Sequence, residues 1–269
     1  MKQSQSFLKR YLDQGYCKHA IKLEYVDGHK TEPSEVMTRG LYFEHHLIGG
    51  TRHGEVPELP KLKVSQVKSG LWRVGNEKAI YSTESDALNN AITTDQKVLD
   101  ELIQDAKVVM DDLGIVPIEV QPEWEHDGFE GHPDLVAEIK SLNIPKAIID
   151  IKYTETKLDD RWTGWADIEN SGKHHYQALG YTYLSQFIHG EPLPFFFLIF
   201  GKSGWVRFIR IRILEESLAH FIGVMEQAKQ MVKEETWDPI GDYNVCRKCQ
   251  FFDVCNQMTI VPQVEIVEI

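Results

Sequence analysis

Residues 131–152, GHPDLVAEIKSLNIPKAIIDIK, decide the fold of this chain. The apolar run that ends at Asp150 is typical of a strand buried on both faces, and Asp134 opens another strand one hairpin upstream. Asp150 and Lys152 are two residues apart, so on a strand their side chains share one face while Ile151 points to the other. We therefore expect Asp134 to bring its carboxylate, from the neighbouring strand, to Asp150 and Lys152.

This group of side chains suits a hard cation. Two carboxylates, together with the backbone carbonyl of Ile151, offer the oxygen ligands that Mg²⁺ or Mn²⁺ prefers. A metal bound there can lower the pKa of a water molecule and offset charge on a phosphate. Lys152 beside it can neutralise developing negative charge. The same D/E-x-K spacing also starts at positions where a solvated helix or strand face is the simpler interpretation: Asp95, Asp105, Glu138 and Glu155.

Hydrophobic periodicity along the rest of the chain predicts an α/β fold. Helices are expected at 6–16, 35–47, 85–113, 173–189 and 214–235. Short strands are expected within 62–81, and longer ones at 115–120, 131–139, 147–153, 195–200 and 206–213.

Two of these helices carry polar residues at spacings that could serve a site. Gln177 and Tyr181 stand at i and i+4, on one face of the helix at 173–189, where they could hydrogen-bond to substrate or to active-site groups. A partly buried amphipathic helix explains the same spacing. Glu44, on the helix at 35–47, could offer a third acidic ligand, although a surface glutamate near the helix C-terminus is the simpler interpretation without further context.

The chain resembles the RecB-like nucleases of the PD-(D/E)XK superfamily, which carry four motifs in the order found here: Gly40-x-x-x-Glu44, Gly131-x-x-Asp134, Asp150-x-Lys152 and Gln177-x-x-x-Tyr181. The resemblance implies a restriction-endonuclease-like αβββαβ core and metal-dependent hydrolysis of DNA phosphodiesters. Many relatives have His where this chain has Glu44, and others have Glu. The resemblance implies catalytic roles for Asp134, Asp150, Lys152, Gln177 and Tyr181, with Gln177 and Tyr181 at the DNA-facing edge. It implies metal ligation by Glu44, Asp134, Asp150 and Ile151.

The four cysteines have the spacing of a metal site. Cys246, Cys249 and Cys255 form C-x2-C-x5-C, and Cys17 is the remaining cysteine. In a reducing compartment clustered thiols indicate a metal rather than disulfides. Zinc bound by three or by all four thiolates satisfies the spacing, as does an iron–sulfur cluster. The pattern resembles the iron–sulfur staple of CRISPR-associated RecB-like nucleases and the AddB nuclease domain, which implies one 4Fe–4S cluster on all four cysteines, although Lys18 replaces the proline that often follows Cys17.

The same resemblance sets the expected domain organisation. Residues 1–269 are expected to form a single nuclease domain, with the nuclease core at about 34–213. The cluster-binding segments are expected at 1–33 and 236–260, joined to each other through the iron–sulfur cluster.

Composition places the protein among ordinary globular chains. Apolar residues make up 42% and charged residues 26%. No apolar run reaches the roughly 18–20 residues of a membrane helix, and the polar N-terminus has no signal-peptide core. We expect no membrane association and a location in the cytoplasm of a bacterium, an archaeon or the host of a phage. The net charge of −12 argues against a surface that grips nucleic acid everywhere, so a DNA-binding groove would be local.

One basic stretch could line such a groove. Lys202, Arg207, Arg210 and Arg212 alternate with the aromatic residues Trp205 and Phe208. Positive charges and stacking rings suit single-stranded DNA, and a solvated strand face explains the pattern equally well.

Three functions remain open at this point. The resemblance favours a DNA exonuclease or end-processing enzyme that acts on single-stranded DNA or DNA ends in recombination, repair, phage replication or CRISPR adaptation, with a protein partner in such a complex. The second is a non-catalytic DNA- or protein-binding module on the same fold. The third is a zinc-stapled α/β protein of unrelated function. An intact set of Asp134, Asp150 and Lys152 favours the enzyme.

Overall fold

The chain divides into two compact units. The first comprises residues 1–32, 125–131 and 213–269, and the second comprises 33–124 and 132–212. The computed structural model describes residues 2–13, 16–30, 33–49, 59, 63–75, 78–158, 172–240 and 246–255.

A five-stranded mixed sheet forms the centre of the second unit, in the order β11-β10-β9-β8-β5. Neighbouring strands are antiparallel except β9 and β10, which are parallel. The strands are β5 (Ile115–Val120), β8 (Leu135–Ile139), β9 (Ile144–Thr154), β10 (Phe195–Gly201) and β11 (Val206–Ile211).

Helix α5 (Gly172–Ile188) provides the crossover that a parallel pair requires, since β9 and β10 cannot be joined by a tight turn. Helix α4 (Glu84–Asp112) precedes β5. The order α4, β5, β8, β9, α5, β10 is therefore the αβββαβ order expected from the sequence. The pair β6 and β7 is inserted between β5 and β8.

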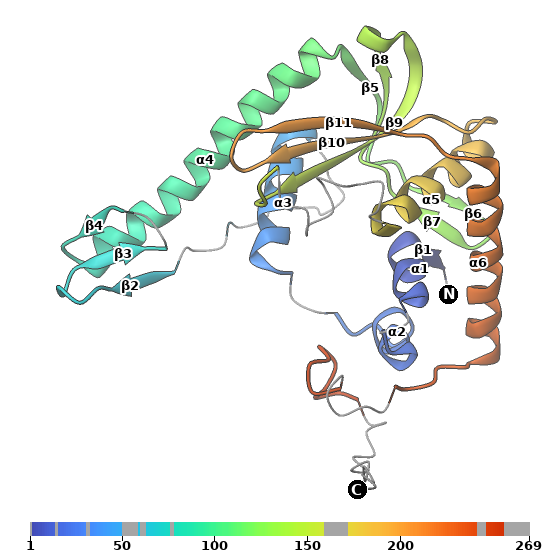
Figure 1. The fold of residues 1–269 in the computed structure, drawn as a ribbon, viewed down its shortest axis with the longest axis horizontal. Helices are drawn as coiled ribbons and strands as arrows, with labels where there is room; N and C mark the ends of the chain where they lie inside the picture. The colour runs from blue at the N-terminus through green and yellow to red at the C-terminus, as the bar shows by residue number, and fades with distance from the viewer. Residues whose placement is uncertain are drawn as a thin grey trace, which may run out of the picture. The chain divides into compact units, whose positions relative to one another are not determined.

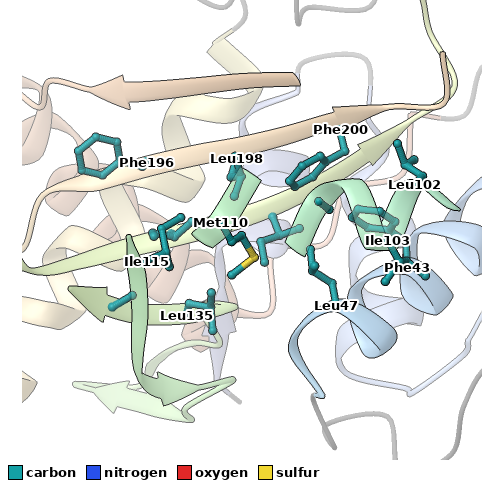
Figure 2. Packing of buried hydrophobic residues seen from close by; sticks show 14 of the residues in the cluster. Phe43, Leu47, Leu102, Ile103, Met110, Ile115, Leu135, Phe196, Leu198 and Phe200 are labelled. Carbon is teal, nitrogen blue, oxygen red and sulfur yellow. The ribbon is translucent and has the colours of Figure 1, made fainter. Parts of the chain in front are cut away.

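Helices α3 (Glu35–Ile48) and α4 bury one face of this sheet. Phe43 and Leu47 of α3 pack with Leu102 and Ile103 of α4 against the strands (Figure 2). Side chains from the sheet complete this core: Ile115, Leu135, Ile149, Ile151, Phe196, Leu198 and Phe200. All seven residues of β10 are buried, as a strand covered on both faces requires.

Both helices have defined starts. The Ser34 hydroxyl caps α3 by accepting a hydrogen bond from the Met37 amide, and Gly49, with φ of 67°, ends this helix in the left-handed conformation that glycine adopts at little cost. Thr83 caps α4 in the same way, through the Asp86 amide. The long α4 runs from the central sheet to a small antiparallel sheet of β2 (Val64–Gln66), β3 (Trp72–Val74) and β4 (Ile80–Tyr81) (Figure 1).

The first unit joins the two ends of the chain. It contains α1 (Gln5–Leu12), α2 (Lys18–Tyr25) and α6 (Glu215–Glu234), together with β1 (Gln3–Ser4), which pairs in parallel with β7 (Phe129–Gly131). Phe129 meets Phe221 of α6 edge to face, with ring centroids 5.6 Å apart. β7 also pairs with β6 (Trp124–His126).

Most of the expected helices and strands are confirmed, with differences at the ends. The helix expected at 6–16 stops at Leu12, and α2 was not expected. The strand expected at 131–139 is split, because β7 ends at Gly131 and β8 starts at Leu135. Pro133 lies in the gap, where its missing N–H cannot break a ladder. None of the described helices is both long and apolar enough to span a membrane.

Candidate active site

Asp134 and Asp150 face each other across β8 and β9. Leu135 pairs with Ile149, so the next position along the antiparallel register sets Asp134 against Asp150. The Asp134 carboxylate accepts a hydrogen bond of 2.6 Å from the backbone N–H of Ile151, which fixes its orientation. The two residues are 7% and 0% exposed. The strand pair thus brings together two buried carboxylates, as the sequence predicted.

Asp150 is held between two side chains. Its Oδ2 forms an ion pair with Lys152 Nζ, and its Oδ1 accepts a hydrogen bond from Gln177 Nε2 of α5. Burial raises the pKa of Asp150 from 3.8 to about 7, because Lys152 and Gln177 only partly offset the loss of water and the charge of Asp134. Asp150 therefore holds its proton more tightly than an exposed aspartate does.

Lys152 stays positively charged in this setting. Burial acts to lower the pKa of its ammonium, but the carboxylates of Asp150 and Asp134 outweigh burial and raise the pKa above its usual value. The side chain is 28% exposed, against 1% for Asp150. Lys152 is therefore a charged group that both touches the buried carboxylate and reaches solvent.

Gln177 and Tyr181 have different positions, although both lie on one face of α5. Gln177 reaches Asp150 directly. The Tyr181 hydroxyl donates a 2.8 Å hydrogen bond to the carbonyl of His132, and its side chain is only 2% exposed. The Tyr181 side chain is therefore buried beside the site, and its expected place at the DNA-facing edge stays a prediction. The bond from its hydroxyl holds the segment that leads to Asp134. Burial of the aromatic ring itself is favoured over its exposure.

Glu44 is oriented by a residue that the sequence did not single out. The Gln121 side-chain amide donates a 2.6 Å hydrogen bond to Glu44 Oε1, and the Gln121 backbone N–H donates a 2.9 Å bond to the carbonyl of Asp134. Gln121 follows β5 and so continues its pairing with the strand of Asp134. Glu44 is thereby linked to the loop of Asp134, and it is partly exposed.

A buried arginine connects α3 to the far end of β9. Arg39 is 4% exposed, and its Nη1 lies 3.2 Å from Glu155 Oε1. The Tyr153 hydroxyl donates to the same oxygen at 3.3 Å. Since an unpaired buried guanidinium is costly, this contact fixes the part of α3 that precedes Glu44.

The basic stretch around β11 divides between the two faces of the sheet. Arg207 pairs with Ile199, which pairs with Lys152, so these three side chains share one face. Phe208 stacks on Phe196 in the core of the opposite face, with centroids 4.8 Å apart. Arg210 lies over the Phe196 ring at 5.9 Å. Of the two arginines in β11, Arg207 is therefore the one that lies on the same sheet face as Asp150.

Trp205 also belongs to the fold. Its indole N–H donates a 3.1 Å hydrogen bond to the carbonyl of Thr156, and the ring covers Gly201 so closely that a Cβ there would lie 2.2 Å from it. Trp205 and Phe208 therefore both pack within the fold, and base stacking by either ring stays a prediction.

All four cysteines lie in the first unit, and three of them share one apolar cluster. Cys17, Cys249 and Cys255 pack against one apolar cluster of Ala20, Leu23 and Phe251. Cys246 is tied to this group by the backbone, because the Cys249 N–H donates to its carbonyl at 2.9 Å. Within the described part of the chain, no three His, Cys, Asp or Glu side chains are close enough to hold a metal ion as they stand.

Comparison with known proteins adds a likeness of fold. No family model matches the sequence, and no curated protein is similar enough to count as a relative. Among solved structures, the chain is similar to a crystal structure from Eubacterium rectale that is described as a "putative exonuclease". The two share 17% identity with a TM-score of 0.59 over 99% of this chain and 91% of the other. The mixed α/β fold of this protein is thus one that a nuclease-like protein also has.

Proposed function

We propose that the protein is a divalent-metal-dependent nuclease that hydrolyses DNA. The observation that carries the proposal is the contact of Lys152 and Gln177 with a fully buried Asp150, opposite Asp134. A buried carboxylate whose pKa is raised, beside a like charge, costs stability, and such arrangements cluster at functional sites. A fold shared with the Eubacterium rectale protein described as an exonuclease is consistent with this function.

The donor set fits Mg²⁺ or Mn²⁺. Asp134, Asp150 and the carbonyl of Ile151 would be the ligands, with Glu44 as a further acidic ligand. All are hard oxygen donors. A cation between Asp134 and Asp150 would remove their mutual repulsion, which raises the Asp150 pKa in its absence. When bound, the metal supplies a water of lowered pKa and offsets charge on the scissile phosphate.

The side chains around the metal ligands have separate tasks. Lys152 carries the fixed positive charge that stabilises charge building up on the phosphate. Gln177 donates to Asp150 Oδ1 and so fixes which way that carboxylate turns. Ammonium and amide nitrogen do not ligate the cation, so neither residue is expected to contribute directly to metal affinity.

Arg207 is the candidate contact for the DNA backbone. Two strand spacings separate it from Lys152 in the same row, roughly 10 Å, so one strand of DNA that crosses the row could touch both residues. A few basic side chains near the site are compatible with the net charge of −12, because the carboxylates of the site count toward that total. We propose single-stranded DNA or DNA ends as substrate, within a recombination, replication or CRISPR complex.

A cleavage assay tests the proposal against a non-catalytic binding module. End-labelled single- and double-stranded DNA is incubated with Mg²⁺ or Mn²⁺ and wild-type protein, Asp150→Ala or Asp105→Ala. Asp105 has the same D-x-K spacing but lies exposed on α4, which makes it a matched control. We expect cleavage by the wild type and by Asp105→Ala, and none by Asp150→Ala. DNA binding without cleavage by the wild type would favour the non-catalytic module.

We further propose that Cys17, Cys246, Cys249 and Cys255 bind one 4Fe–4S cluster. The gathering of three of these cysteines around one apolar cluster supports it, as does the assembly of both chain ends in one unit. Because metal binding contributes to folding free energy, the thiolates need not be fully arranged beforehand. Anaerobically purified protein should contain iron and sulfide, whereas stoichiometric zinc without iron would favour a zinc staple.

A further inference from the structure

The small sheet of β2, β3 and β4 has one packed face and one exposed face. Its packed face lies on α4 around the buried Val74. Ser65, Arg73 and Ile80 stand opposite one another in the register, one position out of step with Val74, so their side chains share the other face. Ser65 and Ile80 are exposed, and Arg73 is half-buried. We call this side of the sheet the outer face.

The pairing of β2 with β3 continues past the ends of both strands. The Gly75 N–H donates to the carbonyl of Lys63 at 2.8 Å, and at the other end the Val67 N–H donates to the carbonyl of Leu71 at 2.8 Å. Because side chains alternate along a strand, Lys63, Val67 and Leu71 also belong to the outer face. Residues 68–70 form the three-residue loop that closes this hairpin.

The outer face is basic, although the protein is acidic. Residues 63–81 contain one acidic residue, Glu77, and four basic residues, whereas the whole chain has a net charge of −12. Lys63 and Arg73 lie on the outer face, Lys68 is in the hairpin loop, and Lys78 precedes β4. None of these four basic residues forms an ion pair with another residue of the described part of the chain. Their positive charge is therefore available to a ligand.

Single-stranded DNA fits this combination of side chains. Lysine and arginine that neutralise phosphates release condensed counterions, which favours binding. The Ser65 hydroxyl, in one row with Arg73, is a further donor for a phosphate oxygen. Leu71 and Ile80 are 38% and 48% exposed, and they offer apolar contact to bases, which a single strand leaves accessible. Two aliphatic side chains give little apolar area for insertion into a membrane, where binding strength scales with that area.

Helix α4 connects the small sheet to the sheet of the candidate active site (Figure 1). Ala87 and Ala91 of this helix pack with the small sheet, and Leu102 and Ile103 pack with the central sheet. At 1.5 Å per residue, the two cores are roughly 20 Å apart along the helix axis. DNA on the outer face would therefore be bound by the same compact unit that contains Asp150.

We infer that the outer face of the small sheet, together with its hairpin loop, binds the phosphate backbone of single-stranded DNA. The identity of this ligand rests on the proposed function, but the binding itself requires no metal. Lys63, Lys68 and Arg73 are assigned to DNA binding and take no part in the chemistry. The surface is a second DNA contact, separate from the carboxylates of the candidate active site.

Binding of a fluorescent oligothymidylate to the full chain in EDTA, at several salt concentrations, tests the inference without cleavage. Each phosphate contact with a single strand contributes about 0.7 to the steepness with which log K, the association constant for DNA, falls with log salt concentration. Lys63→Gln combined with Arg73→Gln should weaken binding and reduce this steepness by about 1.4. Lys63→Gln alone changes an exposed side chain outside the packed face, so the sheet stays folded, and it should reduce the steepness by about 0.7.

Lys107→Gln is the matched control, because it removes the same charge from an exposed position on α4 and should leave the salt dependence unchanged. The same salt dependence in Lys63→Gln as in the wild type would overturn the inference, as would a wild type that binds no DNA in EDTA. A double variant that keeps its DNA affinity but no longer sediments with phosphatidylserine vesicles would assign the outer face to a membrane instead. If the wild type binds DNA through this face but cleaves none with Mn²⁺, the inference stands and the proposed nuclease activity fails.

Discussion

Asp150→Asn should make the metal-free protein more stable while it abolishes metal binding. The folded-state pKa of Asp150 is raised from 3.8 to about 7, so the folded protein holds this proton more tightly than the unfolded chain does. The free energy of unfolding therefore decreases as pH rises from the unfolded-state pKa of 3.8 to the folded-state pKa of about 7. At about 1.36 kcal/mol per pH unit, the loss has an upper limit of about 4 kcal/mol above neutral pH. Asparagine has no such titration.

Urea denaturation in EDTA measures this difference. The free energy of unfolding of the variant should exceed that of the wild type by about 1–2 kcal/mol near pH 5 and by up to about 4 kcal/mol near pH 8. The lost ion pair with Lys152 is already contained in this difference, because that pair contributes to the Asp150 pKa. Asp105→Asn, on the exposed face of α4, should show no comparable gain. A variant that is less stable than the wild type at both pH values would refute the argument that Asp150 is a costly buried charge.

Three further substitutions test separate parts of the site. Lys152→Ala should lose cleavage but keep Mn²⁺ affinity, because ammonium does not ligate metal; lost affinity with an intact fold would assign Lys152 another role. Arg207→Ala should weaken DNA binding and lower the slope of log K, the association constant for DNA, against log salt concentration by about one. An unchanged slope would move the DNA path away from β11. Cys249→Ser should lose iron and lower the melting temperature, and a variant with full iron content would remove Cys249 from the cluster.

The central sheet was predictable because its pattern is local. The apolar run before Asp150 and the spacing of Asp150 and Lys152 are visible along one strand, and the structure places these side chains as that spacing requires. The register that brings Asp134 opposite Asp150 follows from two adjacent antiparallel strands. Short-range periodicity was sufficient for these features.

The remaining features depend on contacts between segments far apart in the chain. Tyr181 is buried where its hydroxyl meets the carbonyl of His132, 49 residues away in the chain. Gln121 became visible only through its positive φ and its bond to Glu44, although a glutamine before proline at a strand end is a weak signal of an unusual backbone. The Trp205 ring can pack over Gly201 only because that residue has no side chain.

Hydrolysis of end-labelled linear single-stranded DNA, beside a circle of the same sequence, tests the central claim most directly. With Mn²⁺ the wild-type protein should degrade the linear strand to short products and leave the circle intact. In EDTA both DNAs should stay intact. A linear strand that stays intact with Mn²⁺ and with Mg²⁺ would contradict the assignment of Asp134, Asp150 and Lys152 as a nuclease site.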